Sequence, residues 1–197
     1  MARGDEIAAL CREYELPQEA QWSLAFQGYA LHLLGRSEEG IATLKSSLAA
    51  QEAISAGLVR TAFLAMLADA LWAAGRHDEG LNAVAEGIRH ASQSTERGYL
   101  AELLRIRGQL LHATGNPAAA EASLREAMEC AVSQQAKSFE LRAASSLAEW
   151  MIASNRHREA HELLSPIYEW FTEGHDTADL VRARTLLAGT AELSGIG

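Results

Sequence analysis

The sequence predicts an all-α fold, a right-handed superhelix of antiparallel helix hairpins stacked side by side. The first observation is a repeat, because Gly35-Arg36-Ser37-Glu38-Glu39-Gly40 returns forty residues later as Gly75-Arg76-His77-Asp78-Glu79-Gly80. Weaker copies follow at the same spacing, Gly115-Asn116-Pro117-Ala118-Ala119-Ala120 and Asn155-Arg156-His157-Arg158-Glu159-Ala160. The second observation is composition: 48% of the residues are apolar and only three are proline, which favours helices with a continuous core. A fixed period of this size is typical of stacked repeats.

Each repeat is expected to run helix, tight turn, helix, loop. The turn falls at Gly35, Gly75, Gly115 and Asn155, which are residue types that tolerate the left-handed conformation at a helix C-cap. In the third repeat Pro117 follows, and proline suits the first turn of a helix. These positions therefore predict four hairpins with a turn in the middle of each.

The packing of each hairpin is predicted from side-chain size. A small residue recurs in the first helix, followed three positions later by a large apolar one. The small positions are Gly28, Ala68, Gly108 and Ala148, and the large ones are Leu31, Leu71, Leu111 and Met151. A small side chain lets the two helices approach closely, since a larger one would overpack the contact.

We expect one domain over residues 1–197. It divides into a partial leading repeat 1–16, four repeats 17–56, 57–96, 97–136 and 137–175, and a closing helix 176–194. Residues 5–15 align with residues 45–55, the later part of a second helix, so the chain is expected to begin inside a repeat, as a fragment or a truncated relative would.

The order of small and large positions resembles the tetratricopeptide repeat, whose period is about 34 residues. The longer period here implies longer helices or longer connecting loops. The resemblance implies the same architecture as the periodicity, a solenoid of helix hairpins.

Three segments carry a narrower resemblance. They are residues 101–111 (AELLRIRGQLL), 135–148 (QAKSFELRAASSLA) and 170–180 (WFTEGHDTADL). Together they resemble the C-terminal tetratricopeptide region of bacterial adenylate-cyclase-like regulators that carry a signalling ATPase module. The chain has no glycine-rich phosphate loop and no pair of metal-binding cyclase aspartates, so the resemblance implies only the role of that region, a sensor or docking scaffold.

Charge and hydropathy exclude several classes of function. The net charge of −9 disfavours binding to nucleic acid. The most apolar stretch, residues 58–74, contains Arg60 and Asp69, and no secretory signal is recognised, so we expect a cytoplasmic protein without a membrane partner.

No enzyme activity, cofactor or metal is expected. His157 and His161 are four residues apart on one helix, but the zinc-protease pattern needs Glu beside the first histidine and Arg158 stands there. An exposed helix face is the simpler interpretation. No Gly-x-Ser-x-Gly segment is present, and we expect no catalytic residues.

The candidate site is a partner-binding groove along the first helices of the repeats, which line the concave face of tetratricopeptide-like stacks. Aromatic residues at one end grade into mixed polar residues at the other. The predicted groove residues are Trp22, Tyr29, His32, Asp69, Trp72, Arg105, Gln109, His112, Arg142 and Glu149. We expect Trp72 at its centre, with Arg105 placed to pair with an acidic group on a partner. Packing between repeats is the alternative role for Trp22, Phe26 and Trp72.

The predicted function is a non-catalytic scaffold or sensor of a bacterial signalling regulator, binding a peptide or protein in this groove. The alternative is a free-standing adaptor that forms a homodimer through its repeat ends, because a solenoid without polar caps leaves an apolar flank.

Overall fold

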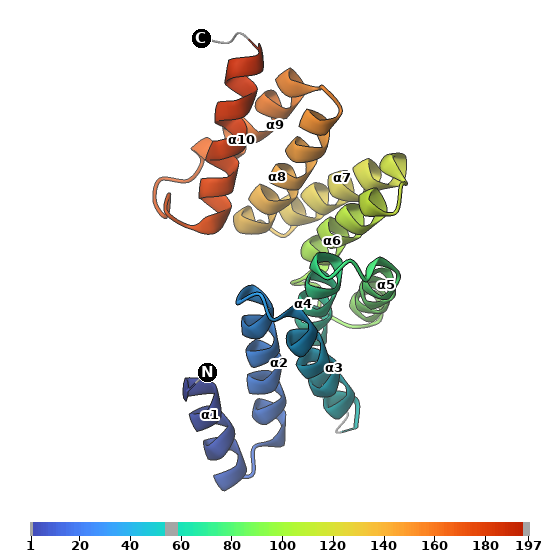
Figure 1. The fold of residues 1–197 in the computed structure, drawn as a ribbon, viewed down its shortest axis with the longest axis vertical. Coiled ribbons are helices and arrows are strands. Elements are labelled where there is room, and N and C mark those ends of the chain that lie inside the picture. Colours follow the sequence, from blue (N-terminus) through green and yellow to red (C-terminus); the bar gives the residue numbers. More distant parts are fainter. Residues whose placement is uncertain (1, 54–58, 195–197) are drawn as a thin grey trace. The chain divides into compact units, whose positions relative to one another are not determined.

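The computed structural model describes residues 2–53 and 59–194, and this part of the chain contains α-helices and no β-strand (Figure 1). The chain divides into two compact units, Met1–Tyr99 and Leu100–Gly197. The first contains α1 (Ala2–Glu13), α2 (Pro17–Leu33), α3 (Ser37–Ala53), α4 (Arg60–Ala73) and α5 (His77–Gln93). The second contains α6 (Leu100–Ala113), α7 (Pro117–Ser133), α8 (Lys137–Ala153), α9 (His157–Glu169) and α10 (Ala178–Ser194).

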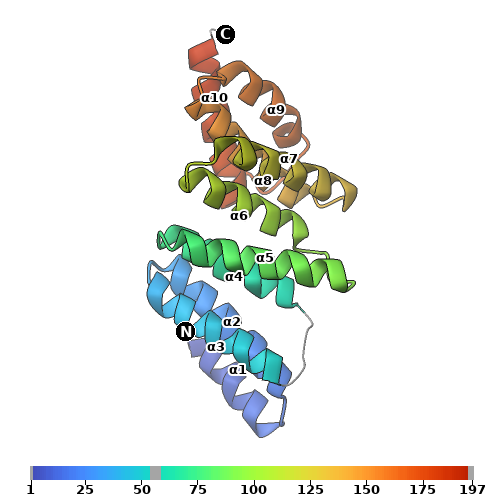
Figure 2. The same ribbon diagram turned by 90° about the vertical axis from the view of Figure 1, so that its right-hand side faces the viewer.

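In the first unit, α2 pairs with α3 and α4 pairs with α5, and α1 packs against α2 (Figures 1 and 2). In the second, α6 pairs with α7 and α8 with α9, while α10 packs on both α8 and α9. We call α2, α4, α6 and α8 the first helices and α3, α5, α7 and α9 the second helices. The described residues thus form an all-α array of helix hairpins.

The predicted turns are confirmed by the backbone. Gly35, Gly75, Gly115 and Asn155 have positive φ angles of 80°, 73°, 79° and 60°. At the first of them the N–H of Arg36 donates to the carbonyl of Leu31 at 2.9 Å, and Gly35 donates to His32 at 2.9 Å. These two bonds satisfy carbonyls that the helix end would otherwise leave unpaired, and the other three turns repeat them.

Two further left-handed residues follow the ends of α7 and α1. Gln135 after α7 and Glu15 after α1 have φ angles of 55° and 53°. The N–H of Ala136 donates to Ala131, and that of Leu16 donates to Cys11, which is the same arrangement as in the turns within hairpins. Neither side chain is typical of this conformation, so sequence patterns did not predict it.

The turns also carry a recurring ion pair. Three repeats place an arginine after the left-handed residue and a glutamate three positions later: Arg36 with Glu39, Arg76 with Glu79, and Arg156 with Glu159. In the third repeat Asn116 takes the arginine's place and caps α7 by accepting from the N–H of Ala119. Hydrogen bonds from Arg76 and from Lys45 lower the pKa of Glu79 to about 2.

The close approach within each hairpin is confirmed where the small residue is glycine. A Cβ on Gly108 would lie 2.6 Å from Cγ of Leu124 on α7. A Cβ on Gly40 of α3 would lie 2.5 Å from the carbonyl oxygen of Gly28 on α2, so here the two backbones themselves are in contact. The size of these residues therefore sets the helix spacing.

The helix α4 begins without a capping side chain of its own, after Val59 in a left-handed conformation. A carboxylate from the loop after α5 takes over this role. Oε1 of Glu96 accepts from the backbone N–H of Thr61 at 2.9 Å and from its hydroxyl at 2.7 Å, and Oε2 lies 3.1 Å from Nε2 of His90. A negative group at this helix end is favourable because unpaired N–H groups gather there.

Candidate functional site

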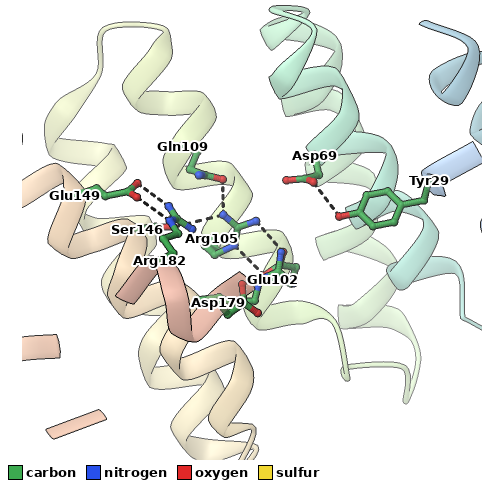
Figure 3. A network of polar contacts seen from close by, with 10 residues as sticks. Tyr29, Asp69, Glu102, Arg105, Gln109, Ser146, Glu149, Asp179 and Arg182 are labelled. Atoms are coloured by element: carbon green, nitrogen blue, oxygen red, sulfur yellow. Dashed lines mark hydrogen bonds and ion pairs between the residues drawn. The ribbon is translucent and has the colours of Figure 1, made fainter. Parts of the chain in front are cut away.

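In the first unit, predicted groove residues of α2 and α4 meet. The hydroxyl of Tyr29 donates to Oδ2 of Asp69 at 3.0 Å (Figure 3), and Nε2 of His32 lies 3.7 Å from the same oxygen. The other ring nitrogen of His32 lies 3.0 Å from the hydroxyl of Ser37 at the start of α3. Tyr29 and Asp69 stand at equivalent positions of successive repeats, so the repeat brings them together.

The two tryptophans of the first unit lie at opposite ends of their helices. Trp72 is half-buried near the end of α4, where its carbonyl accepts from the turn residue Gly75. Trp22 is half-buried near the start of α2 and lines a cavity between α1 and α2. Phe26 on α2 is 56% exposed and makes an edge contact with the buried Phe63 of α4, with ring centroids 5.6 Å apart.

In the second unit, Arg105 is buried, with only 3% of its surface exposed. Its guanidinium donates two hydrogen bonds to Glu102, at 2.9 and 2.8 Å, and a third to Oε1 of Gln109. Glu102 is itself 4% exposed. The expected pairing of Arg105 with an acidic group on a partner is therefore not supported, because this bidentate pair already occupies the guanidinium.

The exposed part of this network is supplied by α8 and α10. Arg142 lies 2.7 Å from Glu102 and 3.9 Å from Asp179 of α10. Glu149 accepts two hydrogen bonds from Arg182 of α10, at 2.7 and 2.6 Å (Figure 3). The side chains of Arg142, Glu149 and Arg182 are 27%, 42% and 32% exposed. Partly exposed charged groups on α8 and α10 thus share one surface, which Arg142 joins to the buried pair of α6. We call Arg142, Glu149, Asp179 and Arg182 the polar face of the second unit.

The sequence analysis missed Asp179 and Arg182 as members of this face. The repeat carries a signal for one of them, since Arg182 stands forty residues after Arg142 and is its counterpart on the closing helix. Of the remaining predicted residues, Gln109 joins the network through Arg105. His112 is exposed at the end of α6, and its backbone carbonyl accepts from Gly115.

The histidine pair of α9 contacts two different groups. His157 lies 3.1 Å from the amide oxygen of Asn155, and His161 lies 3.1 Å from the hydroxyl of Thr190 on α10. Within residues 2–53 and 59–194 no three His, Cys, Asp or Glu side chains are placed to hold a metal ion. None of the helices in this part of the chain combines the length and apolar character needed to cross a membrane.

Three segments of the chain match the tetratricopeptide repeat, residues 21–45, 61–86 and 101–126. Each begins in a first helix and ends in the second helix of the same hairpin, α2–α3, α4–α5 and α6–α7. No curated protein matches this chain.

Solved structures with a similar fold include the TPR-like repeats of a Podosopora anserina protein described as a putative kinesin light chain. The identity is 18% and the TM-score 0.67, over 92% of this chain and 89% of that one. A variant of the same protein is similar at the same identity and TM-score, over 91% of this chain and 88% of that one. The matched segments and the shared fold identify this chain as an all-α array of tetratricopeptide-like repeats.

Proposed function

We propose that this chain is a non-catalytic scaffold that binds a protein or peptide partner along its first helices. Tetratricopeptide arrays are typically protein-interaction modules, and their stacked repeats present extended binding surfaces. The observation that carries the proposal is the gathering of polar side chains from successive repeats, Tyr29 with Asp69 in one unit and Arg142, Glu149 and Arg182 in the other.

The two units offer different contacts to a partner. In the first, the half-buried Trp72 is the aromatic anchor, because large aromatic residues carry most of the binding energy in many interfaces. In the second, the polar face offers partly exposed cations and carboxylates, which suit a segment carrying both charges.

The resemblance of residues 101–111, 135–148 and 170–180 supports a finer proposal. The chain would serve as the sensor or docking part of a cytoplasmic bacterial signalling regulator, with no nucleic-acid or membrane partner. We further propose that residues 1–197 act as one repeat domain, with repeats at 17–56, 57–96, 97–136 and 137–175.

The test is affinity capture from the native cytoplasm, followed by titration of the captured partner with Trp72→Ala and Glu149→Ala. Trp72→Ala is expected to weaken binding by about 2 kcal/mol. It should cost less stability than the roughly 3–5 kcal/mol of a fully buried tryptophan. Val132→Ala is the matched control, since Val132 is 55% exposed on α7, a second helix. Unchanged affinity in both folded variants would contradict the proposed site.

The second candidate is a free-standing adaptor that forms a homodimer through its repeat ends. The exposed apolar side chains Ile7 and Leu10 on α1 favour it, at 48% and 51% exposure. Light scattering over a range of concentrations separates monomer from dimer.

A further inference from the structure

The cavity between α1 and α2 lies apart from the polar side chains described above. Its volume is about 430 Å³ and its lining is mainly apolar, with Ile7 from α1 and Trp22, Phe26, Leu31 and Leu34 from α2 and its C-terminal end. Three of these residues are strongly exposed, Ile7 at 48%, Phe26 at 56% and Leu34 at 68%. We call this surface the end groove.

The repeat shows what normally covers such a surface. The counterparts of Ile7 in the following repeats are Ser47, Gly87, Ala127 and Ile167, and all four are buried. Each lies on a second helix that is paired with the first helix preceding it. For example, the hydroxyl of Ser47 on α3 donates to the carbonyl of Gln21 on α2 at 2.7 Å. In the described chain α1 has the position of a second helix, and no first helix covers Ile7.

The end groove also differs in sequence from the other repeats. The first repeat ends its first helix with Leu33 and Leu34, which are 67% and 68% exposed. At the same positions the later repeats carry small or polar pairs: Ala73-Ala74, Ala113-Thr114 and Ala153-Ser154. Bulky apolar side chains at these exposed positions are thus confined to the first of the four repeats, beside the uncovered helix.

We propose that the end groove binds an amphipathic α-helix of a partner protein, in the place that a first helix takes against a second helix elsewhere in the array. The bound helix packs on the groove as α2 packs on α3. Its apolar stripe covers Phe26 and Ile7. This surface includes Trp22 and Phe26 of the first helix α2 but neither Trp72 nor the polar face of the second unit. Variants at Phe26 and Leu34 therefore test it separately from Trp72→Ala and Glu149→Ala.

The charges beside the groove define the partner helix further. Glu19 lines the cavity, and residues 2–34, which form α1, α2 and the turn between them, carry five carboxylates against two arginines: Asp5, Glu6, Glu13, Glu15 and Glu19 against Arg3 and Arg12. These carboxylates favour Lys and Arg beside the apolar stripe of the partner. A second copy of the chain would bring the same acidic groups together, which makes self-association through this surface less favourable.

The test uses three synthetic 18-residue peptides as probes. One has leucine at helical spacing with lysine elsewhere, the second replaces every lysine by glutamate, and the third scrambles the first. Calorimetric titration is expected to show saturable one-to-one binding of the Leu/Lys peptide only. Equal binding of the scrambled peptide, or no saturable binding of the Leu/Lys peptide, would overturn the proposal.

Substitutions of end-groove residues test whether the Leu/Lys peptide binds at this surface. Phe26→Ser is expected to weaken binding about tenfold, and Leu34→Ala by a smaller factor. Leu34→Ala is expected to remain folded, because the next repeat already has alanine, Ala74, at this position. Val132→Ser on α7 is the control for an equally exposed apolar residue in the other unit. Folded Phe26→Ser and Leu34→Ala variants that bind as tightly as the parent chain would overturn the assignment to this groove. A concentration-dependent dimer that Phe26→Ser dissociates would do so too, by naming a second copy as the occupant.

Discussion

The two units are built from the same hairpin, yet they differ in how the helix beside their hairpins is packed, α1 in the first unit and α10 in the second. In the second unit α10 covers α8 and α9, burying Leu180 and Ala183 in a core with Leu147 and Leu164. In the first unit α1 leaves Ile7 and its neighbours about half exposed. The repeat therefore does not determine how well the helix beside a hairpin is covered, because its apolar side must be covered by a neighbour that the repeat itself does not supply.

The faces of the first helices differ as well. The first unit joins α2 to α4 by one hydrogen bond between Tyr29 and Asp69 and by the nearby His32. The second unit holds a buried ion pair, Glu102 with Arg105, and extends it through Arg142 to α10. The first helices thus meet through one tyrosine–carboxylate hydrogen bond in the first unit and through arginine–carboxylate ion pairs, at other positions of the repeat, in the second.

The largest expected effect comes from breaking the buried ion pair of the second unit. Glu102→Ala leaves the guanidinium of Arg105 buried without its main partner, and we expect a loss of about 3–5 kcal/mol in the free energy of unfolding. Glu149→Ala is the matched control, because Glu149 also pairs with an arginine but is 42% exposed, and we expect about 1 kcal/mol or less. Urea denaturation compares them. Equal losses in the two variants would show that burial does not distinguish these pairs.

The closest backbone approach lies in the first unit and predicts the next effect. Gly40→Ala should destabilise the protein by about 1–3 kcal/mol, because the new Cβ meets the carbonyl of Gly28 and the helices must separate. Hydrogen exchange should show faster opening of α2 and α3. The control is Gly189→Ala in α10, where a Cβ meets nothing within 4 Å, so a gain of about 0.5–1 kcal/mol is expected. A neutral Gly40→Ala would mean that the hairpin relaxes freely.

Tyr29→Phe tests the hydrogen bond between the first helices of the first unit. It removes the hydroxyl that donates to Asp69 while keeping the ring, so we expect a loss of about 0.5–1.5 kcal/mol. Hydrogen exchange of α2 and α4 should increase, with that of α8 unchanged. A loss as large as that of Glu102→Ala would remove the contrast between the two faces.

The smallest effect concerns the exposed turn pairs. Because the pKa of Glu79 is lowered from 4.5 to about 2, its carboxylate stabilises the fold above its unfolded pKa. That contribution is lost as the pH falls towards about 2. In the Glu79→Gln variant the free energy of unfolding should therefore fall less steeply as the pH decreases below about 4.5. The counterpart in the third repeat is Ala119, which has no carboxylate to pair, so Ala119→Gln should leave the pH profile unchanged. A parallel decline in the parent and Glu79→Gln proteins would contradict the assignment.

The sequence was most informative where the structure depends on local geometry. The turn residues and the small positions were predicted because left-handed conformations and close helix contacts each select few residue types. Gln135 and Glu15 were missed for the same reason, since their side chains do not favour the conformation that they adopt. The polar face was predicted only in outline. The repeat period places Arg105 on the helix face that was predicted to line the groove. Its burial depends on contacts with Glu102, Gln109 and α8, and the period does not give the positions of these groups.

The hairpin arrangement has a consequence for how the chain folds. Within the described residues, helices that pack together are adjacent along the chain or separated by one other helix. Native contacts therefore form between segments close in sequence, so little loop-closure entropy opposes the first of them. We expect any one hairpin to serve as a nucleus, with folding in the microsecond to millisecond range typical of such helical proteins and able to begin while the rest of the chain is still being synthesised.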